Sequence, residues 1–277
     1  MSAVTVVHAN TVRPTHQPGF TDLLHSEWTK FKTLRSSWWS LAVMTVVSVG
    51  VSITATSVFT GTYNTLDAQT KARFQDDTIG LFLQPGSQFG QLAIAVLGVL
   101  AISSEYSSGM IRTSLIAVPK RGRVLAAKSL VFAVATFVVG EVVSFTAFFA
   151  GQALISGHAP HAALGDPGVA RAVAGAGLYL TALAVLSVAA GALLRHPAAA
   201  IAAMMAVLLV LPGIAQALPD SWRNPVTEFW PTQAGGQLTS VHPAAHSLQP
   251  WPGFGVMCLF VAIVYAIAWT LLDRRDA

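Results

Sequence analysis

Six long apolar stretches constrain this chain more than any other feature. A transmembrane helix needs about 20 consecutive, mainly apolar residues. Six stretches meet or nearly meet that length, at residues 38–59, 83–102, 125–155, 172–194, 198–218 and 254–272. Only 10% of the residues are charged, whereas soluble domains usually carry about 25%. The sequence therefore predicts an all-α integral membrane protein with six transmembrane helices.

The second stretch is the least regular of the six. Gln84 and Pro85 interrupt its start, so we expect this start to be irregular or to pack against protein rather than lipid. Gly86 and Gly90 form a small-xxx-small pair, a spacing that is found at helix contacts and is also common by chance. The third stretch is longer than one crossing needs, and a tilt or a protruding end would accommodate it. Only residues 195–197 separate the fourth and fifth stretches, which predicts a tight helical hairpin.

The distribution of basic residues predicts the orientation in the membrane. Six spans place both termini on one side, and twelve of the 16 Lys and Arg residues then fall on that side. These twelve are Arg13, Lys30, Lys32, Arg35, Arg112, Lys120, Arg121, Arg123, Lys128, Arg195, Arg274 and Arg275. Basic residues are enriched on the cytoplasmic side of membrane proteins. We therefore expect a multi-pass protein of the cell membrane with both termini in the cytoplasm.

A flexible tail, residues 1–19, is expected to precede a single transmembrane domain, residues 20–277. The domain would begin with an amphipathic helix over residues 20–36, because its apolar residues fall on one side of a helical wheel. They are Phe20, Leu23, Leu24, Trp28, Phe31 and Leu34. Lys30 and Lys32 fall on the opposite side. Such a helix is suited to lying at the membrane surface. A plain membrane anchor and a helix that also contacts a cytoplasmic partner both remain open.

Glu27 falls inside the apolar side of this predicted helix. A carboxylate in that position should have a cationic partner. Arg35 and Arg112 are the candidate partners.

The segment between the second and third stretches carries a second pattern. Glu105 follows the end of a span, a short helix-like piece is predicted over residues 108–117, and Pro119 ends it. Four residues, 120–123, then supply three basic side chains. Topology and contact with lipid head groups would explain the charges. They do not explain why Ile111 and other apolar residues accompany Arg112 in a short amphipathic piece.

Three segments together resemble the permease subunits of ABC-2 type transporters, especially the actinobacterial ones. Residues 26–39 look like the start of the first span in that family. Residues 105–113, followed by 118–123, are similar to its first cytoplasmic loop, and residues 231–236 are similar to the region before its last span. The resemblance in architecture covers nearly the whole chain, and the specific motifs cover about a fifth of it.

The resemblance implies a mechanism and a set of partners. Residues 20–36 would be an interface helix, and residues 105–117 would contain a short coupling helix. The chain would pair with a second permease, identical or different, and with two copies of a separate ATP-binding subunit. ATP-driven closure of those subunits would switch the pair between inward- and outward-facing states. The cargo would be expelled, as a drug, antibiotic, lipid or peptide, and antibiotic resistance is one expected outcome.

The resemblance also implies which residues meet the ATPase. Those expected in the coupling segment are Glu105, Tyr106, Gly109, Arg112 and Thr113. Those expected in the interface helix are Glu27, Trp28, Lys30 and Arg35.

No catalytic residue, cofactor or metal site is expected in this chain. It has no Gly-x-x-x-x-Gly-Lys-[Ser/Thr] motif, and the nearest sequence, residues 126–129, lacks the glycines that let backbone N–H groups hold phosphate. ATP hydrolysis is therefore assigned to a separate subunit. The basic residues gather at one membrane face and form no separate basic domain, so nucleic acid is not an expected partner.

Glu141 is the one acidic residue expected in the middle of a span. Ionisable groups at that depth are costly and usually face a cavity or a partner. Glu141 is therefore a candidate for lining a translocation path. The alternative is a protonated carboxylic acid that is hydrogen-bonded to a neighbour such as Ser144.

A different class of function also remains open. The chain could be a membrane immunity or sensor protein that transports nothing and binds a lipid or peptide. A membrane enzyme would need clustered Asp, His or Ser at one face, and the sequence shows no such cluster. A secondary transporter would usually show an internal repeat, which is also missing from the sequence.

Overall fold

The computed structural model describes residues 19–33, 35–76, 78–107, 121–156, 162–243 and 246–274. Every regular element within these residues is a helix. The α-helices are α1 (Phe20–Thr33), α2 (Arg35–Thr62), α3 (Ala68–Asp76), α4 (Thr78–Ser107), α6 (Arg121–Ile155), α7 (Val169–Leu194), α8 (Pro197–Met205), α9 (Leu211–Ala215), α10 (Asp220–Phe229), α11 (Pro231–Gly236) and α12 (Pro250–Arg274). Single turns of 3-10 helix are η1 (Tyr63–Thr65) and η3 (Gln237–Thr239), and η2 (Ala206–Val210) is π-helical.

The prediction of an all-α protein with six possible membrane spans is confirmed. In the described part of the chain, six helical segments are long and apolar enough to cross a membrane. They are Ser37–Thr65, Phe82–Ser107, Gly122–Ile155, Val169–Leu194, Pro197–Ala215 and Pro250–Arg274. The segment Gly122–Ile155 is the longest of them, with 34 residues. The expectation of an overlong third span is therefore correct.

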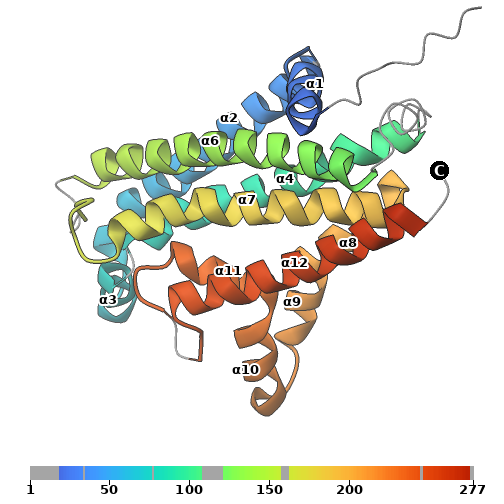
Figure 1. Ribbon diagram of the computed structural model, residues 1–277. Coiled ribbons are helices and arrows are strands. Elements are labelled where there is room, and N and C mark those ends of the chain that lie inside the picture. Colours follow the sequence, from blue (N-terminus) through green and yellow to red (C-terminus); the bar gives the residue numbers. More distant parts are fainter. Residues whose placement is uncertain are drawn as a thin grey trace, which may run out of the picture.

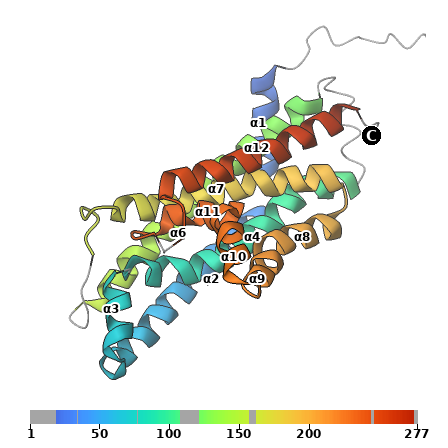
Figure 2. The same cartoon turned by 90° about the horizontal axis from the view of Figure 1, so that it is seen from below.

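Successive spans run in opposite directions. At one end of the bundle, Lys128 near the start of α6 meets Glu105 near the end of α4. We call this the charged end. The start of α6 also meets the end of α12 there, because Trp269 lies on Gly122. At the opposite end, Phe82 near the start of α4 lies on Gly151 near the end of α6. Helix α1 and the end of α12 both lie toward the charged end (Figures 1 and 2).

Helix α7 forms the centre of the bundle. In the apolar part of α7, 67% is buried inside the protein, whereas only 22% of the corresponding part of α12 is buried. Glycines let the neighbouring helices approach closely. A Cβ atom added to Gly140 of α6 would lie 3.1 Å from the Cα atom of Gly177 in α7. On the α4 side, Gly98 lies against Ser187, and Gly191 lies against the backbone of Val99.

Helices α2 and α4 meet at the glycine pair noted in the sequence. Gly86 lies against Ser48 and Ser52. A Cβ atom added to Gly90 would lie 3.2 Å from the Cε atom of Met44. The start of the second span therefore packs against protein. It is not irregular, because α4 continues as one helix through Pro85. The outer face of α2 is apolar and exposed, as the 72% exposure of Val46 shows, and this suits contact with lipid.

The fifth span, Pro197–Ala215, is one continuous helix, as expected from the sequence, and its middle is π-helical. It consists of α8, the π-helical turn η2, and α9. Pro212 has no N–H group, so a backbone carbonyl one turn earlier loses its helical donor. The indole Nε1–H of Trp230 donates to the carbonyl of Val207 at 3.0 Å. A side chain outside the span thus supplies a hydrogen bond that the proline cannot make.

Helices α10 and α11 follow the fifth span. Helix α10 projects away from the bundle (Figures 1 and 2). Helix α11 turns back onto it, because Gly235 lies against Met257 of α12. Arg171 of α7 fixes the turn that follows, since its guanidinium donates to the carbonyls of Leu238 and Ser240 at 2.9 Å each.

Candidate functional site

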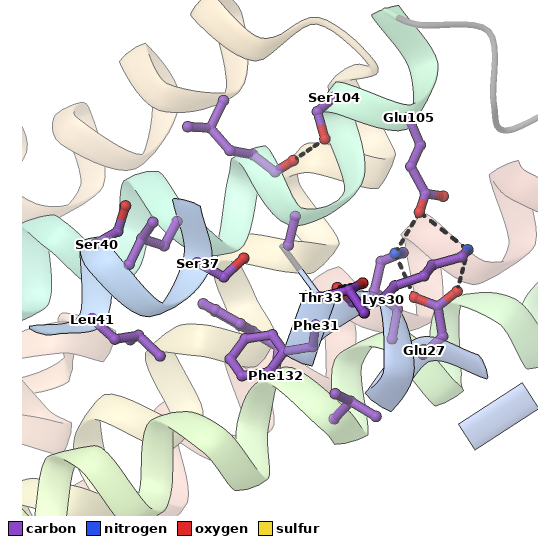
Figure 3. Close-up of a pocket in the computed structure, with 15 residues that line it drawn as sticks. Glu27, Lys30, Phe31, Thr33, Ser37, Ser40, Leu41, Ser104, Glu105 and Phe132 are labelled. Atoms are coloured by element: carbon purple, nitrogen blue, oxygen red, sulfur yellow. Dashed lines mark hydrogen bonds and ion pairs between the residues drawn. The ribbon is translucent and has the colours of Figure 1, made fainter. Parts of the chain in front are cut away.

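Four charged side chains from three helices meet at the charged end. Glu27 and Lys30 come from α1, Glu105 from α4 and Lys128 from α6 (Figure 3). The Nζ atom of Lys128 lies 2.6 Å from Glu27 and 2.8 Å from Glu105. The Nζ atom of Lys30 lies 2.7 Å from Glu27 and 3.4 Å from Glu105. Each lysine therefore bridges the two carboxylates, and we call these four residues the ion cluster.

The ion cluster is mostly shielded from its surroundings. The side chains of Glu27, Glu105 and Lys128 are 5%, 8% and 8% exposed, while Lys30 is 35% exposed. Buried charges are tolerated when they are paired and hydrogen-bonded. Two carboxylates and two ammonium groups make the cluster neutral. Removing one member would leave an uncompensated charge in a site from which water is largely excluded.

A small apolar contact next to the ion cluster positions it. Leu23 of α1 packs against Val124 and Ala127 of α6. Glu27 lies four residues after Leu23, and Lys128 lies four residues after Val124, so each charge is one helical turn beyond this contact on the same face. The apolar contact therefore sets the register in which Glu27 and Lys128 meet.

The electrostatics of α1 follow from this packing. Burial by itself would raise the pKa of Glu27, but the charges and hydrogen bonds of Lys128 and Lys30 outweigh it and lower that pKa below its ordinary 4.5. Burial by itself would lower the pKa of Lys30, but Glu27 and Glu105 outweigh it and raise that pKa above its ordinary 10.5. Glu27 is thus held as a carboxylate and Lys30 as an ammonium group near neutral pH.

Tyr106 follows Glu105 in α4 and contacts Arg195 at the end of α7. The guanidinium of Arg195 lies 5.4 Å from the centre of the Tyr106 ring, within the range of a cation–π interaction. Arg195 caps α7 with a positive φ of 56°, and its N–H bonds to the carbonyl of Gly191. The tight hairpin predicted between the fourth and fifth spans therefore contacts the end of α4.

The structure brings together only some of the residues expected to meet a partner. Glu27, Lys30 and Glu105 are in the ion cluster, and Tyr106 is beside it. Trp28 lies outside the cluster and stacks on Phe31 with ring centres 6.0 Å apart. The side chain of Arg35, and all of Gly109, Arg112, Thr113 and the predicted helix over 108–117, lie outside the described residues.

Lys128 is the site residue that the sequence reasoning missed. The sequence pattern places Lys128 only among the basic residues that set the topology. Its position inside the third apolar stretch was a usable signal, because a lysine there needs an acidic partner. The described partners of Glu27 are Lys128 and Lys30.

Glu141 lies within α6 and faces α7, where its carboxyl group rests on Gly177. Ser144 does not bond to this carboxyl group, because its hydroxyl donates to the backbone carbonyl of Glu141 at 3.2 Å. Among the described residues, no group donates to the buried Oε1 atom. A buried carboxyl oxygen normally has a donor. The proposed role of Glu141 in a translocation path stays a prediction.

A cavity of about 660 Å³ opens beside the ion cluster, between α1, α2, α4 and α6 (Figure 3). All four charged residues line one part of it. The remainder is mainly apolar, with Leu41, Leu97 and Phe132 among its lining residues. The cavity is therefore polar at the charged end and apolar toward the middle of the spans.

The described residues contain no group of three or more His, Cys, Asp or Glu side chains that could hold a metal ion. No known protein family and no curated protein matches this chain in sequence.

Proposed function

We propose that this chain is the permease subunit of an ABC-2 type exporter. The observation that carries the proposal is the ion cluster, which joins α1 to both helices that flank residues 108–120. In the proposal, α1 is the amphipathic interface helix, and residues 108–117 contain the coupling helix. The resemblance of the two motifs and the six apolar helices support the same assignment.

The proposed orientation places the charged end in the cytoplasm of the cell. Twelve of the 16 basic residues then lie on the cytoplasmic side. A separate ATP-binding subunit would meet α1 and residues 105–117 there. The chain itself would hydrolyse no ATP.

The ion cluster would transmit movement from the ATPase to the spans. Separating a buried carboxylate from a buried ammonium group is costly where water is scarce. A push on α1 or on the end of α4 would therefore move α1, α4 and α6 together. Two permease chains, identical or different, would rock between inward- and outward-facing states. The exported molecule would be a drug, antibiotic, lipid or peptide, with Glu141 along its path.

The test is co-purification of the tagged protein in mild detergent, followed by mass spectrometry and an ATPase assay. We expect an ATP-binding subunit in the eluate. Lys128→Met should lower transport-coupled ATPase activity, because it removes the ion pairs that join α6 to α1 and α4. The matched control is Arg223→Ala, which removes a basic residue from an exposed pair on α10, far from the ion cluster.

Two results would contradict the proposal. One is a protein that elutes alone and has no neighbouring gene that encodes a Walker A motif. The other is an ATPase whose activity responds equally to Lys128→Met and Arg223→Ala. Either result would favour a membrane immunity or sensor protein without transport activity.

A further inference from the structure

The cavity beside the ion cluster continues into a second hollow. A groove of about 570 Å³ runs between α2 and α4, and Ser40 and Leu97 line both the cavity and the groove. The groove is bordered by Trp39, Val43 and Phe89, which are 71%, 57% and 49% exposed. The cavity therefore opens along an apolar path to the outer surface of the bundle.

The polar end of this path has unused hydrogen-bonding groups. Lys30 is the most exposed member of the ion cluster, and its ammonium group has three donors for two carboxylate partners. Ser37 and Ser40 also line the cavity. Among the described residues, neither of these two hydroxyls makes a hydrogen bond. The ammonium group of Lys30 and the hydroxyl of Ser37, which is the nearer of the two serines, suit a phosphate group.

The path has the dimensions of a lipid chain. Ser37 lies at its polar end, and Ser48 lies at the far end of the groove. Eleven residues of helix separate them, which corresponds to about 16 Å at 1.5 Å per residue. That length is about half the hydrocarbon thickness of a bilayer, which is about 30 Å. An acyl chain of one leaflet therefore fits along it.

We infer that this path binds a membrane phospholipid from the leaflet at the charged end. Its phosphate contacts Lys30 and Ser37, and one acyl chain follows Ser40 and Leu97 into the groove between α2 and α4. The lipid then lies against α1, α2, α4 and α6 and fills the space beside the ion cluster. This inference does not depend on transport or on an ATPase.

Native mass spectrometry of the full-length protein in mild detergent tests the inference. The probes are phosphatidylglycerol and a diacylglycerol with the same acyl chains. We expect the protein to retain phosphatidylglycerol and to release the diacylglycerol. Lys30→Gln should weaken retention about tenfold, as expected for a loss of about 1.4 kcal/mol, and Lys30→Arg should largely preserve it. Leu97→Trp should block the path and abolish retention without changing a charge.

A matched control is Ile263→Trp, which adds the same bulk at a 51% exposed site on α12 and should leave retention unchanged. Equal retention of both probes would overturn the inference, because no phosphate would then be recognised. Retention that survives both Lys30→Gln and Leu97→Trp would overturn it as well.

A second copy of the chain could occupy the groove instead. Val43→Cys in a Cys258→Ala background reports this by disulfide formation between copies. The inference expects Val43→Cys protein that forms no disulfide between copies and retains phosphatidylglycerol. Cross-linked dimers without retained lipid would assign the groove to a protein contact and overturn the inference.

Discussion

At the scale of single residues, the ion cluster is the feature that distinguishes the charged end. Surface ion pairs contribute little to stability, because water competes for both partners. Glu27, Glu105 and Lys128 are buried, so each carboxylate depends on the ammonium groups that face it. The cluster therefore makes the position of α1 sensitive to single substitutions and to pH.

Lys128→Met should lower the free energy of unfolding by about 3–5 kcal/mol, since it leaves two buried carboxylates with Lys30 alone. Adding Glu27→Gln to Lys128→Met should recover part of the loss, because one unpaired charge disappears. Denaturant unfolding in detergent measures both changes. Arg223→Ala, at an exposed pair on α10, should change the free energy of unfolding by less than about 1 kcal/mol. Similar losses of unfolding free energy for Lys128→Met and Arg223→Ala would show that burial does not make the ion cluster more important than an exposed pair.

The pKa shifts in α1 predict a stability maximum at neutral pH. The pKa of Glu27 is lowered in the folded protein, so its contribution is complete above the ordinary value of 4.5 and is lost as pH falls through the folded value. The pKa of Lys30 is raised, so its contribution is complete below 10.5 and is lost as pH rises through the folded value. Thermal unfolding from pH 3 to 8 should therefore show a difference between the protein and Glu27→Gln that narrows in acid. A difference in unfolding temperature that stays constant over this pH range would contradict the lowered pKa of Glu27.

At the scale of helices, the fifth span shows how tertiary contacts alter a regular element. Its apolar composition predicts one helix, and the chain forms one continuous helix whose middle, η2, is π-helical. Pro212 removes one backbone donor, and the indole of Trp230 compensates at Val207. The π-helical stretch and the position of the segment after α10 are therefore coupled.

Trp230→Phe should destabilise the protein by about 0.5–1.5 kcal/mol, because the half-buried carbonyl of Val207 loses its donor. Hydrogen exchange should rise in η2 and α9 more than in α7. Trp222→Phe is the matched control, since Trp222 is 68% exposed on α10, and it should leave both quantities unchanged. Equal exchange in the two variants would show that the hydrogen bond does not stabilise the π-helical stretch.

At the scale of the whole molecule, six spans in alternating directions place α1 and the end of α12 at the charged end. Helix α7 lies in the middle, and α2 and α12 expose apolar faces toward their surroundings. The placement of Glu105, Lys128 and Arg195 at one end follows from this alternation. At this scale we predict that the charged end faces the cytoplasm.

Cysteine labelling in intact cells checks the orientation. In a Cys258→Ala background, Thr62→Cys lies at the opposite end and Asp273→Cys lies at the charged end, and both positions are exposed. A membrane-impermeant maleimide should label Thr62→Cys in intact cells and Asp273→Cys only after the membrane is opened. The reverse pattern would place the charged end outside the cell and contradict the proposed contact with a cytoplasmic ATPase.

The sequence by itself determined the number, approximate bounds and helical nature of the spans. Lipid excludes water, so a segment such as 172–194 must satisfy its backbone hydrogen bonds internally and can be recognised from composition alone. The glycine pair Gly86 and Gly90 does lie at a helix contact, although its spacing is also common by chance. These features depend on neighbours within one or two helical turns.

Only the tertiary structure decided which charges meet and which span contains a π-helical stretch. Lys128 joins Glu27, 101 residues away, and no local pattern encodes that pairing. It requires α1 to pack on α6 through Leu23 and Val124. The hydrogen bond from Trp230 to Val207 likewise depends on the chain returning after α10. Ion pairs and hydrogen bonds depend on residues that are close in space but distant in the sequence. The hydropathy that defines a span depends on residues that are neighbours in the sequence.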